Sequence, residues 1–371
     1  MVNNTVANYS DYEAEERGAR FAGGWVTWFI GALVVAAVVA FSSTPSGYVV
    51  EMPGEVHDTL GTVEIDGDTV PLVDIPMEET FPTTGSLSML TVSTLGDRER
   101  TALWSTVIAA WLDRSQAVLP VDEVFPADVT SDELSEYSAA QMAQSQKTAV
   151  AAALTVLGHE YTKVVSVFGT MGAGPSDGVL LAGDVITAVN SVAVPDVPAL
   201  RAQLDANGLE KAAVISILRA GVAQDVSITP IADDNVPIIG INTLEEYDFP
   251  FDVSIQLEGI GGPSAGHIFA LAIIDKLTPG PLTGGKDVAG TGTISEDGTI
   301  GAIGGIRQKM YGAVSSGADY FLAPAANCDQ VVGAIPDGLT VFAVSTLADS
   351  LAVLNTLSTG ASTALLARCE S

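Results

Sequence analysis

The sequence holds few of the residues that bind metal ions or that cross-link small domains through disulfides. Its 371 residues include two cysteines and three histidines, His57, His159 and His267, which lie far apart in the chain. Two cysteines are too few for a disulfide scaffold or a cysteine-rich metal site, and the histidines lack the spacing of metal ligands. The composition therefore predicts a chain without a bound metal.

Basic residues are scarce as well. Fifteen lysines and arginines stand against 45 aspartates and glutamates, which leaves a formal net charge of −30. A field of this sign repels the phosphate backbone, so we expect no nucleic-acid partner. The acidity is typical of a soluble surface rather than of an acidic docking site.

Hydrophobic residues make up 47% of the chain, which is enough to bury a large core. The length predicts two or three domains. Strand-like and helix-like patterns are mixed along the chain, so we expect an α+β fold.

One long stretch carries no charge. It runs from residue 21 to residue 50 and contains the apolar run WVTWFIGALVVAAVVAF at residues 25 to 41, which is long enough to cross a bilayer as a helix. Arg17 and Arg20 precede this run, whereas the next basic residue is Arg98. The positive-inside rule thus predicts a cytoplasmic tail over residues 1 to 24, a transmembrane anchor over 25 to 41 and extracytoplasmic domains after it.

Two other interpretations of this stretch remain open. The small residues at positions 38 to 40 could mark a signal-peptidase site, although the apolar run is long for a signal peptide. A buried helix of a soluble domain would also be apolar, but it rarely lacks polar positions on every face. An uncleaved anchor fits the pattern best.

The cysteines lie in the part of the chain that we expect outside the membrane. Because that environment is oxidising, Cys328 and Cys369 are candidates for a disulfide that ties a C-terminal tail, residues 361 to 371, to the last domain. Two free thiols are the alternative.

Residues 45 to 158 show no chemistry beyond single hydroxyls and carboxylates, so we expect a scaffold region. Short alternating runs up to about residue 95 predict strands and turns. Helices are predicted over about 97 to 115 and 131 to 157. Ser131 supplies an N-terminal capping signal for the second helix, and Gly158 ends it.

A different pattern follows over residues 161 to 230. A strand at residues 163 to 167 precedes the sequence GPSDG, the run GDVITAVN at 183 to 190, a helix from about Val197 and two strands that end at Ile228. This order resembles a PDZ domain, with the helix around Leu200 and Leu204 flanking the peptide groove. The resemblance implies binding of extended peptides by strand addition. The carboxylate-binding loop has no clear counterpart, and a PDZ fold that acts only as a spacer is the alternative.

The last domain, predicted over residues 231 to 360, contains the sequence GGPSAG at 261 to 266 before an apolar helix. Glycines allow a tight turn, and a serine at a helix start lies beside unpaired backbone N–H groups. The site could therefore stabilise an oxyanion with the turn formed by Gly262, Pro263, Ala265 and Gly266. Taken alone, Ser264 is more often an ordinary helix cap.

A second motif changes the interpretation of this serine. IGGIRQK at residues 303 to 309 follows AGTGTI at 289 to 294, and APAAN stands at 323 to 327. Together with the PSAG tetrapeptide these motifs resemble the Lon-type serine-lysine peptidases. With the anchor and the PDZ-like region, the whole chain resembles the membrane-anchored, PDZ-containing Lon-like proteases of bacteria. The resemblance implies that Ser264 is the nucleophile and Lys309 the base.

The chemistry agrees with these roles. A lysine can deprotonate serine only if desolvation lowers its pKa, and Lys309 lies among apolar residues. An exposed lysine whose stem covers apolar surface is the alternative. His267, three residues after Ser264, is a competing base without a visible acidic partner. Thr291 is a candidate to support Lys309 by a hydrogen bond.

The sequence departs from the family pattern at two positions. Thr293 stands where glutamate is usual, and Gly262 stands where aspartate is frequent. The run GPLTGGKD at residues 280 to 287 approaches a phosphate-binding loop, but Asp287 replaces the required serine or threonine. We therefore expect no cofactor and ATP-independent cleavage of protein or peptide substrates. The alternative function is a catalytically silent PDZ-based scaffold at the membrane. The sequence leaves the oligomeric state open.

Overall fold

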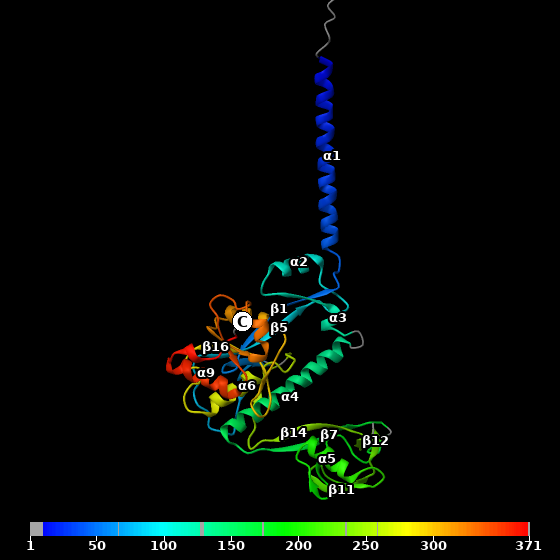
Figure 1. Ribbon diagram of the computed structural model, residues 1–371, viewed down its shortest axis with the longest axis vertical. Helices are drawn as coiled ribbons and strands as arrows, with labels where there is room; N and C mark the ends of the chain where they lie inside the picture. The colour runs from blue at the N-terminus through cyan, green and yellow to red at the C-terminus, as the bar shows by residue number, and fades with distance from the viewer. Residues whose placement is uncertain are drawn as a thin grey trace, which may run out of the picture.

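The computed structural model describes residues 10–65, 67–126, 130–172, 174–233, 236–257 and 259–369 (Figure 1). Its architecture is α+β, as predicted. A long N-terminal helix, α1 (Ser10–Ser42), leads into a layered α/β unit, and a smaller strand-rich unit lies beside it. The helix window Trp25–Ser42 has a mean hydropathy of 2.1 and none of it is buried, so α1 is long and apolar enough to span a membrane.

A six-stranded mixed sheet forms the centre of the layered unit, in the order β20-β19-β16-β5-β1-β6. The antiparallel part comes from β1 (Tyr48–Asp58), β5 (Ser86–Leu95) and β6 (Ala117–Pro120). β16 (Asp287–Gly290), β19 (Tyr320–Pro324) and β20 (Thr340–Val344) extend it in parallel. Strands from the two ends of the chain thus share one sheet.

The sheet is covered on both faces because its inner strands are apolar on both sides. Val288, Leu322 and Phe342 pack with α6 (Gly266–Leu277) and α9 (Leu347–Thr359) in the largest core. Their neighbours Ala289 and Phe321 pack on the other face, where α7 (Ile306–Ser315) and α8 (Cys328–Val331) lie. Both helices that carry the predicted dyad motifs therefore rest on this sheet, one on each face.

Helix α4 (Ser131–Leu157) packs against α6 and forms an outer layer. Its range agrees with the prediction, and Gly158 ends it in the left-handed conformation with φ 75°. The N-terminal cap is Thr130 rather than Ser131, because Thr130 and Glu133 form a reciprocal capping box. The other predicted helix is shorter than expected, since α2 spans Trp104–Leu112.

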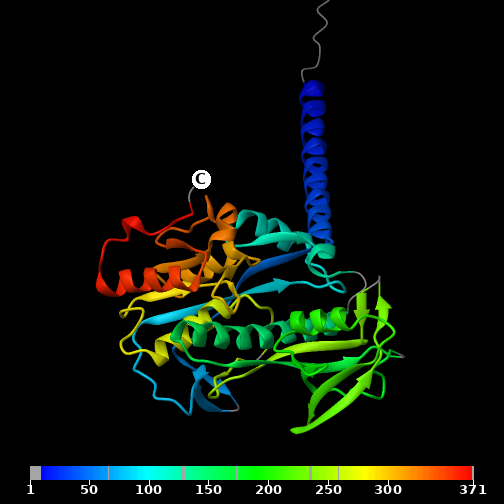
Figure 2. The same cartoon turned by 60° about the horizontal axis from the view of Figure 1, so that its bottom comes forward.

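The smaller unit has the strand order β11-β10-β8-β7-β14, and β9 pairs with β8. Its elements are β7 (Thr162–Thr170), β8 (Val185–Val189), β9 (Val192–Ala193), α5 (Val197–Asn207), β10 (Ala213–Arg219), β11 (Val222–Ile228) and β14 (Ile241–Asp248). A separate core holds it together. The buried carboxylate of Asp184 accepts two hydrogen bonds from the Arg219 guanidinium and so ties the start of β8 to the end of β10. These hydrogen bonds lower the pKa of Asp184. Figure 2 shows this unit alongside α4.

The domain boundaries differ from those read in the sequence. Residues 241–248, expected at the start of the last domain, pair as β14 with β7 of the PDZ-like unit. Residues 48–120, expected in a separate scaffold region, supply half of the sheet that carries α6 and α7. The PDZ-like unit is thus inserted between α4 and residue 249. Spacing along the chain cannot reveal such distant strand partners.

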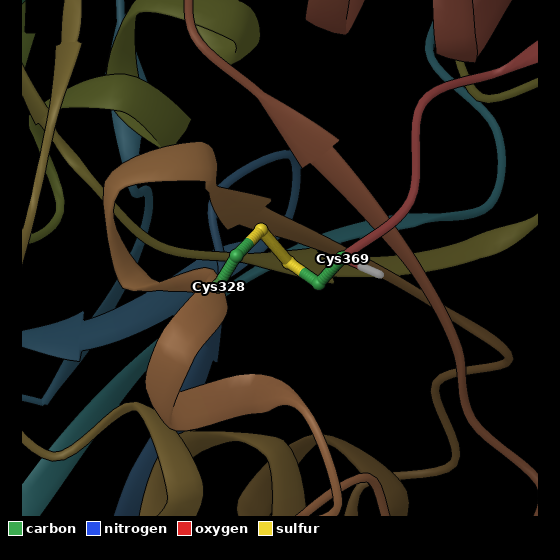
Figure 3. Close-up of a disulfide and its surroundings, with 2 residues drawn as sticks. All are labelled: Cys328 and Cys369. Atoms are coloured by element: carbon green, nitrogen blue, oxygen red, sulfur yellow. A yellow bond between two sulfur atoms is a disulfide. The ribbon is translucent and has the colours of Figure 1, made fainter. Parts of the chain in front are cut away.

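The remaining elements are short. They are β2 (Thr62–Ile65), β3 (Asp68–Pro71), β4 (Val73–Asp74), α3 (Val121–Val124), β12 (Ile231–Asp233), β13 (Val236–Ile238), β15 (Ser254–Ile255), β17 (Thr293–Ile294), β18 (Ile300–Gly301), η1 (Ala325–Asn327) and η2 (Thr363–Leu365). Cys328 and Cys369 form a disulfide across a sequence separation of 41 (Figure 3). It joins the C-terminal segment to the start of α8, as the sequence led us to expect.

Candidate active site

Ser264 and Lys309 lie together although 45 residues separate them in the sequence. The ammonium group of Lys309 donates a hydrogen bond to Ser264 Oγ at 2.6 Å and a second one to Thr291 Oγ1 at 3.0 Å. Lys309 is 3% exposed and Thr291 is 1% exposed. A hydroxyl, an amine and a supporting hydroxyl thus meet in one protected place.

Burial changes the protonation of this lysine. Desolvation disfavours the charged amine and lowers the pKa of Lys309 to about 8. Among the described residues, no carboxylate lies within ion-pair distance of its Nζ to oppose this shift. A large share of the amine is therefore neutral slightly above neutral pH, as a proton acceptor must be.

The loop that carries Ser264 is fixed on two sides. On one side, Ser145 in α4 donates to the Pro263 carbonyl at 3.0 Å, and Gly262 N–H donates to the Ser138 carbonyl at 2.8 Å. On the other side, the Ser264 carbonyl accepts bonds from Gly292 N–H at 2.8 Å and from Thr291 Oγ1 at 2.9 Å. The nucleophile loop is held between α4 and the segment after β16.

Ser264 is not a helix cap. Helix α6 begins at Gly266, its N-cap residue is Ala265, and no side chain caps it. A Cβ at Gly266 would lie 2.6 Å from Ser145 Oγ, so the close approach of α4 requires glycine here. Ser264 therefore stands one residue before the cap, with its hydroxyl directed at Lys309.

Two backbone N–H groups near the serine hydroxyl remain free. Within the described part of the chain, the N–H groups of Ser264 and Ala265 have no hydrogen-bond acceptor. By contrast, Gly262 and Gly266 donate to the carbonyls of Ser138 and Pro263, and proline has no N–H to offer. Of the four turn residues predicted for an oxyanion site, Ala265 is the one whose backbone N–H has no acceptor among the described residues. The backbone N–H of Ser264 is a second such donor.

The base is positioned by the loop before α7. Gly305 has φ 66° and precedes the first helical residue, and a Cβ there would lie 2.6 Å from Val92 Cγ2. Asn327 holds the same loop, because its side chain exchanges two hydrogen bonds with the backbone of Ile303 at 2.9 and 3.0 Å. Sequence reasoning assigned no role to Ser145 or Asn327. Asn327 ends the APAAN stretch, which was the available signal for it.

His267 does not compete as the base. Its ring is fully buried and lies between the Ser350 hydroxyl at 2.8 Å and the Thr291 carbonyl at 3.2 Å. Desolvation lowers its pKa to about 4, so the ring stays neutral near pH 7. Its contacts make it a structural residue that supports the strand end carrying Thr291.

The dyad opens into a cleft of about 710 Å³. One wall is formed by β1 and by residues 89–93 of β5, and the other by residues 259–265 and the start of α7. β16 pairs with β5 only as far as Met89, whereas β1 follows β5 to Leu95. Among the described strands, none covers the second edge of β5 beyond Met89, so the cleft exposes a strand edge.

A second groove, of about 440 Å³, lies in the PDZ-like unit between α5 and the start of β14. Leu200, Leu204 and residues 238–241 line it. The N–H groups of Ile239 and Gly240 have no acceptor among the described residues, and Gly240 has φ 70°. This Ile-Ile-Gly-Ile segment lies where a carboxylate could be held, and sequence reasoning missed it because it follows residue 230.

Comparison with known proteins agrees with the site. Residues 258–356 match the family model described as the Lon protease (S16) C-terminal proteolytic domain. "Lon protease 1" of Sorangium cellulosum is 37% identical over 94 residues, which cover 24% of this chain and 11% of that protein. The Lon protease of Geobacter metallireducens is 34% identical over 113 residues, which cover 30% of this chain and 14% of that protein. The chain thus matches a small part of these relatives.

Solved structures of PDZ domains also match part of the chain. The PDZ domain of an SdrC-like protein from Listeria monocytogenes is 23% identical, covers 22% of this chain and 86% of that structure, and has a TM-score of 0.20. The corresponding domain from Listeria innocua is 22% identical, covers 22% of this chain and 92% of that structure, and has a TM-score of 0.21.

Proposed function

From the Lon-type proteolytic domain over residues 258–356, we propose that this chain is a serine endopeptidase with a Ser264–Lys309 dyad. The observation that carries the proposal is the 2.6 Å hydrogen bond between Lys309 Nζ and Ser264 Oγ in a buried place that lowers the lysine pKa. A structural lysine gains little from being desolvated beside two neutral hydroxyls with no carboxylate partner, whereas a general base needs that environment.

The geometry supports a complete acyl-transfer cycle. Neutral Lys309 takes the proton of Ser264 Oγ as the oxygen attacks the peptide carbonyl, and the free N–H groups of Ser264 and Ala265 stabilise the oxyanion. Lys309 then returns the proton to the leaving amine. Water, deprotonated by the same lysine, releases the acyl group from Ser264. Thr291 holds the amine in place throughout.

The open edge of β5 favours an extended peptide as the substrate. An incoming strand could pair with the backbone of residues 90–93, which would bring one of its carbonyls past the dyad in the same cleft. The groove beside α5 would take a second peptide segment in the same way, because β14 is an edge strand. We propose that this groove selects substrate or partner chains.

We further propose that the enzyme acts outside the cytoplasm and without ATP. The apolar window of α1 and the arginines before it support an anchor with the catalytic unit outside, and the Cys328–Cys369 disulfide fits an oxidising compartment. A run resembling a phosphate-binding loop at residues 280–287 lacks the required hydroxyl. Casein cleavage by the full chain should not change when ATP and magnesium are added.

The catalytic proposal is tested with an active-site fluorophosphonate probe and casein cleavage, using the full chain in lipid nanodiscs. Ser264→Ala should abolish labelling and cleavage. Lys309→Ala and Lys309→Arg should lower cleavage by about 10³-fold or more, since arginine cannot act as a base. Ser315→Ala and Lys286→Ala change exposed residues and serve as matched controls. Equal labelling of the wild type and Ser264→Ala would reject the proposal.

The alternative is a silent scaffold that binds peptides through the groove beside α5. The apolar groove with two free N–H groups favours it as a binding site. Peptide binding that survives Ser264→Ala, together with no turnover by the wild type on a broad peptide library, would select this alternative.

A further inference from the structure

Helix α2 (Trp104–Leu112) has an apolar face that nothing in the described chain covers. The helix contains no charged residue. Val107 and Ala110 point inward and pack with Val50 of β1 in a small core. On the outer side, Ile108 is 44% exposed, Trp111 is 62% exposed and Leu112 is 85% exposed.

An exposed apolar face without charged residues is unusual on a protein surface that contacts water. The chain carries a net charge of −30, and acidic side chains dominate its polar surface. An exposed tryptophan and leucine next to one another on a chargeless helix cost free energy in water, and such patches mark interaction sites. The question is which partner covers them.

The position of α2 identifies the partner. The Phe41 ring, in the last turn of α1, stacks on Trp104 with ring centroids 5.4 Å apart. Trp104 N–H donates to the Thr44 carbonyl at 3.2 Å, and Pro45 bridges to Leu103. Helix α2 is therefore attached where the apolar window of α1 ends, and Figure 1 shows it beside the lower end of α1 and running across the α1 direction.

We propose that α2 is a membrane-interface helix that lies on the outer surface of the lipid bilayer. Trp111 and Leu112 enter the boundary between headgroups and acyl chains, while Val107 and Ala110 hold the catalytic sheet against them. The apolar face lies next to the end of the apolar surface of α1, as expected for a helix in the interfacial plane beside a spanning one. Because the chain is strongly acidic, the contact depends on apolar insertion rather than on charge.

The proposal rests on the membrane anchoring proposed above. Contact of α2 with the lipid would have its own effect on the catalytic unit, because a single spanning helix alone would leave that unit free to rotate relative to the membrane. With α1 and α2 both engaged, the unit is held in one orientation over the lipid.

The test uses the full chain in phosphatidylcholine and phosphatidylglycerol vesicles. Both native cysteines are in the disulfide, so Leu112→Cys introduces a thiol that can be labelled with an environment-sensitive fluorophore under non-reducing conditions. Val222→Cys, at a residue that is 67% exposed on β11 of the PDZ-like unit, is the matched control. Lipids that carry a quencher at a shallow acyl position should quench the label at residue 112 at least about twofold more than the label at residue 222.

Two results would overturn the proposal. In the first, both labels remain equally water-exposed and unquenched. In the second, the label at residue 112 is shielded only as protein density in the vesicles rises and is not quenched by lipid, which would make α2 a contact between copies of the chain. Flotation of the labelled chain with the vesicles measures anchoring by α1 separately, and fluorophosphonate labelling of Ser264 measures catalysis separately. A loss of anchoring by α1 or of catalysis by Ser264 can thus be distinguished from a failure of α2 to contact the lipid.

Discussion

Lys309, the proposed base, imposes an energetic cost on the fold. Its pKa falls from 10.5 to about 8 on folding, so the folded state holds the charged form against its preference at neutral pH. A group with a depressed lysine pKa destabilises the fold below pH 8, and this penalty fades as pH rises from 8 to 10.5. Burial of Lys309 therefore does not stabilise the fold at neutral pH, which agrees with the proposed role of a base.

We therefore expect Lys309→Met to be inactive and more stable. The shift from 10.5 to about 8 corresponds to roughly 3–4 kcal/mol at pH 7, less what is lost with the hydrogen bonds to Ser264 and Thr291. Chemical unfolding at pH 7 and pH 10 measures this. The gain should shrink at pH 10, whereas a gain that is equal at both values would show that titration of Lys309 is not its source.

The pH dependence of cleavage follows from the same group. The neutral amine is the active form, so kcat/KM should rise about tenfold per pH unit below pH 8 and level off above it. His267, with a pKa of about 4, adds no inflection between pH 5 and 7. A profile that rises near pH 6.5 would point to a histidine base instead.

The resemblance of two motifs to a known family was sufficient to select Ser264 and Lys309, which lie in contact in the structure, but not the groups that position them. The PSAG tetrapeptide and the lysine after the Ile-Gly-Gly run carry that resemblance. Ser145 lies in an alanine-rich helix, and its bond to the Pro263 carbonyl spans 118 residues of sequence. Its role depends on tertiary packing, which one sequence does not show.

At the scale of elements, local signals predicted helices better than strand partners. The range of α4 follows from helix-forming residues, an N-terminal cap and Gly158, all of which act within a few residues. The pairing of β16 with β5 joins residues about 200 positions apart and has no local signature. For that reason the sequence separated two regions that share one sheet.

One carboxylate contributes two contacts to the junction between the PDZ-like unit and the proposed catalytic unit. Glu296, in the turn between β17 and β18, accepts a hydrogen bond from the Tyr247 hydroxyl and pairs with Lys163 Nζ at 2.5 Å. Both partners lie on strands of the PDZ-like unit. Glu296 is five residues from Thr291 in the sequence.

Glu296→Gln should loosen this junction without unfolding either unit. We expect a loss of about 1 kcal/mol, because the pair is partly exposed and solvent weakens it. Hydrogen exchange should rise in residues 243–249 and 295–299 and stay unchanged around α9. Glu160→Gln, an exposed carboxylate near the same junction, is the control. Exchange that rises equally in both variants would remove any special role for Glu296.

The C-terminal segment is held to the catalytic unit by its disulfide and by Arg368, whose guanidinium lies 5.3 Å from the Phe342 ring centroid. Replacing Cys328 and Cys369 by serine should lower the unfolding free energy by about 2–4 kcal/mol, because the bond closes a loop with a sequence separation of 41. Thermal unfolding of the double variant measures the loss. An unchanged Tm would mean that the two thiols are free in the native protein.

At the scale of the whole molecule, the cleft lies close to the C-terminal end of α1. β1 starts at Tyr48, six residues after α1, and Glu51 and Glu55 of β1 line the cleft. At the rise of an extended strand, these residues are at most about 25 Å from Tyr48. With the proposed membrane anchor, segments of other membrane proteins just outside the bilayer would be within reach of Ser264 and Lys309.

We expect lipid-anchored substrates to be cleaved faster than soluble ones. A peptide joined to a lipid by a short spacer shares the membrane surface with the enzyme, which should raise its initial rate by about tenfold or more at equal bulk concentration. The soluble peptide without the lipid, in the same vesicles, is the control. Equal rates for the two would indicate that the cleft draws its substrates from solution.

The ends of the inserted unit meet. Thr162 at the start of β7 is paired with Asp248 at the end of β14, so the chain leaves the catalytic unit and re-enters it at neighbouring points. A domain whose two ends are adjacent can be replaced by another domain without moving the chain on either side of it. A short flexible bridge, or a binding module from another protein, could be spliced in at this place while the strands and helices around the dyad keep their own connections. Recognition and cleavage can thus diversify independently within one polypeptide.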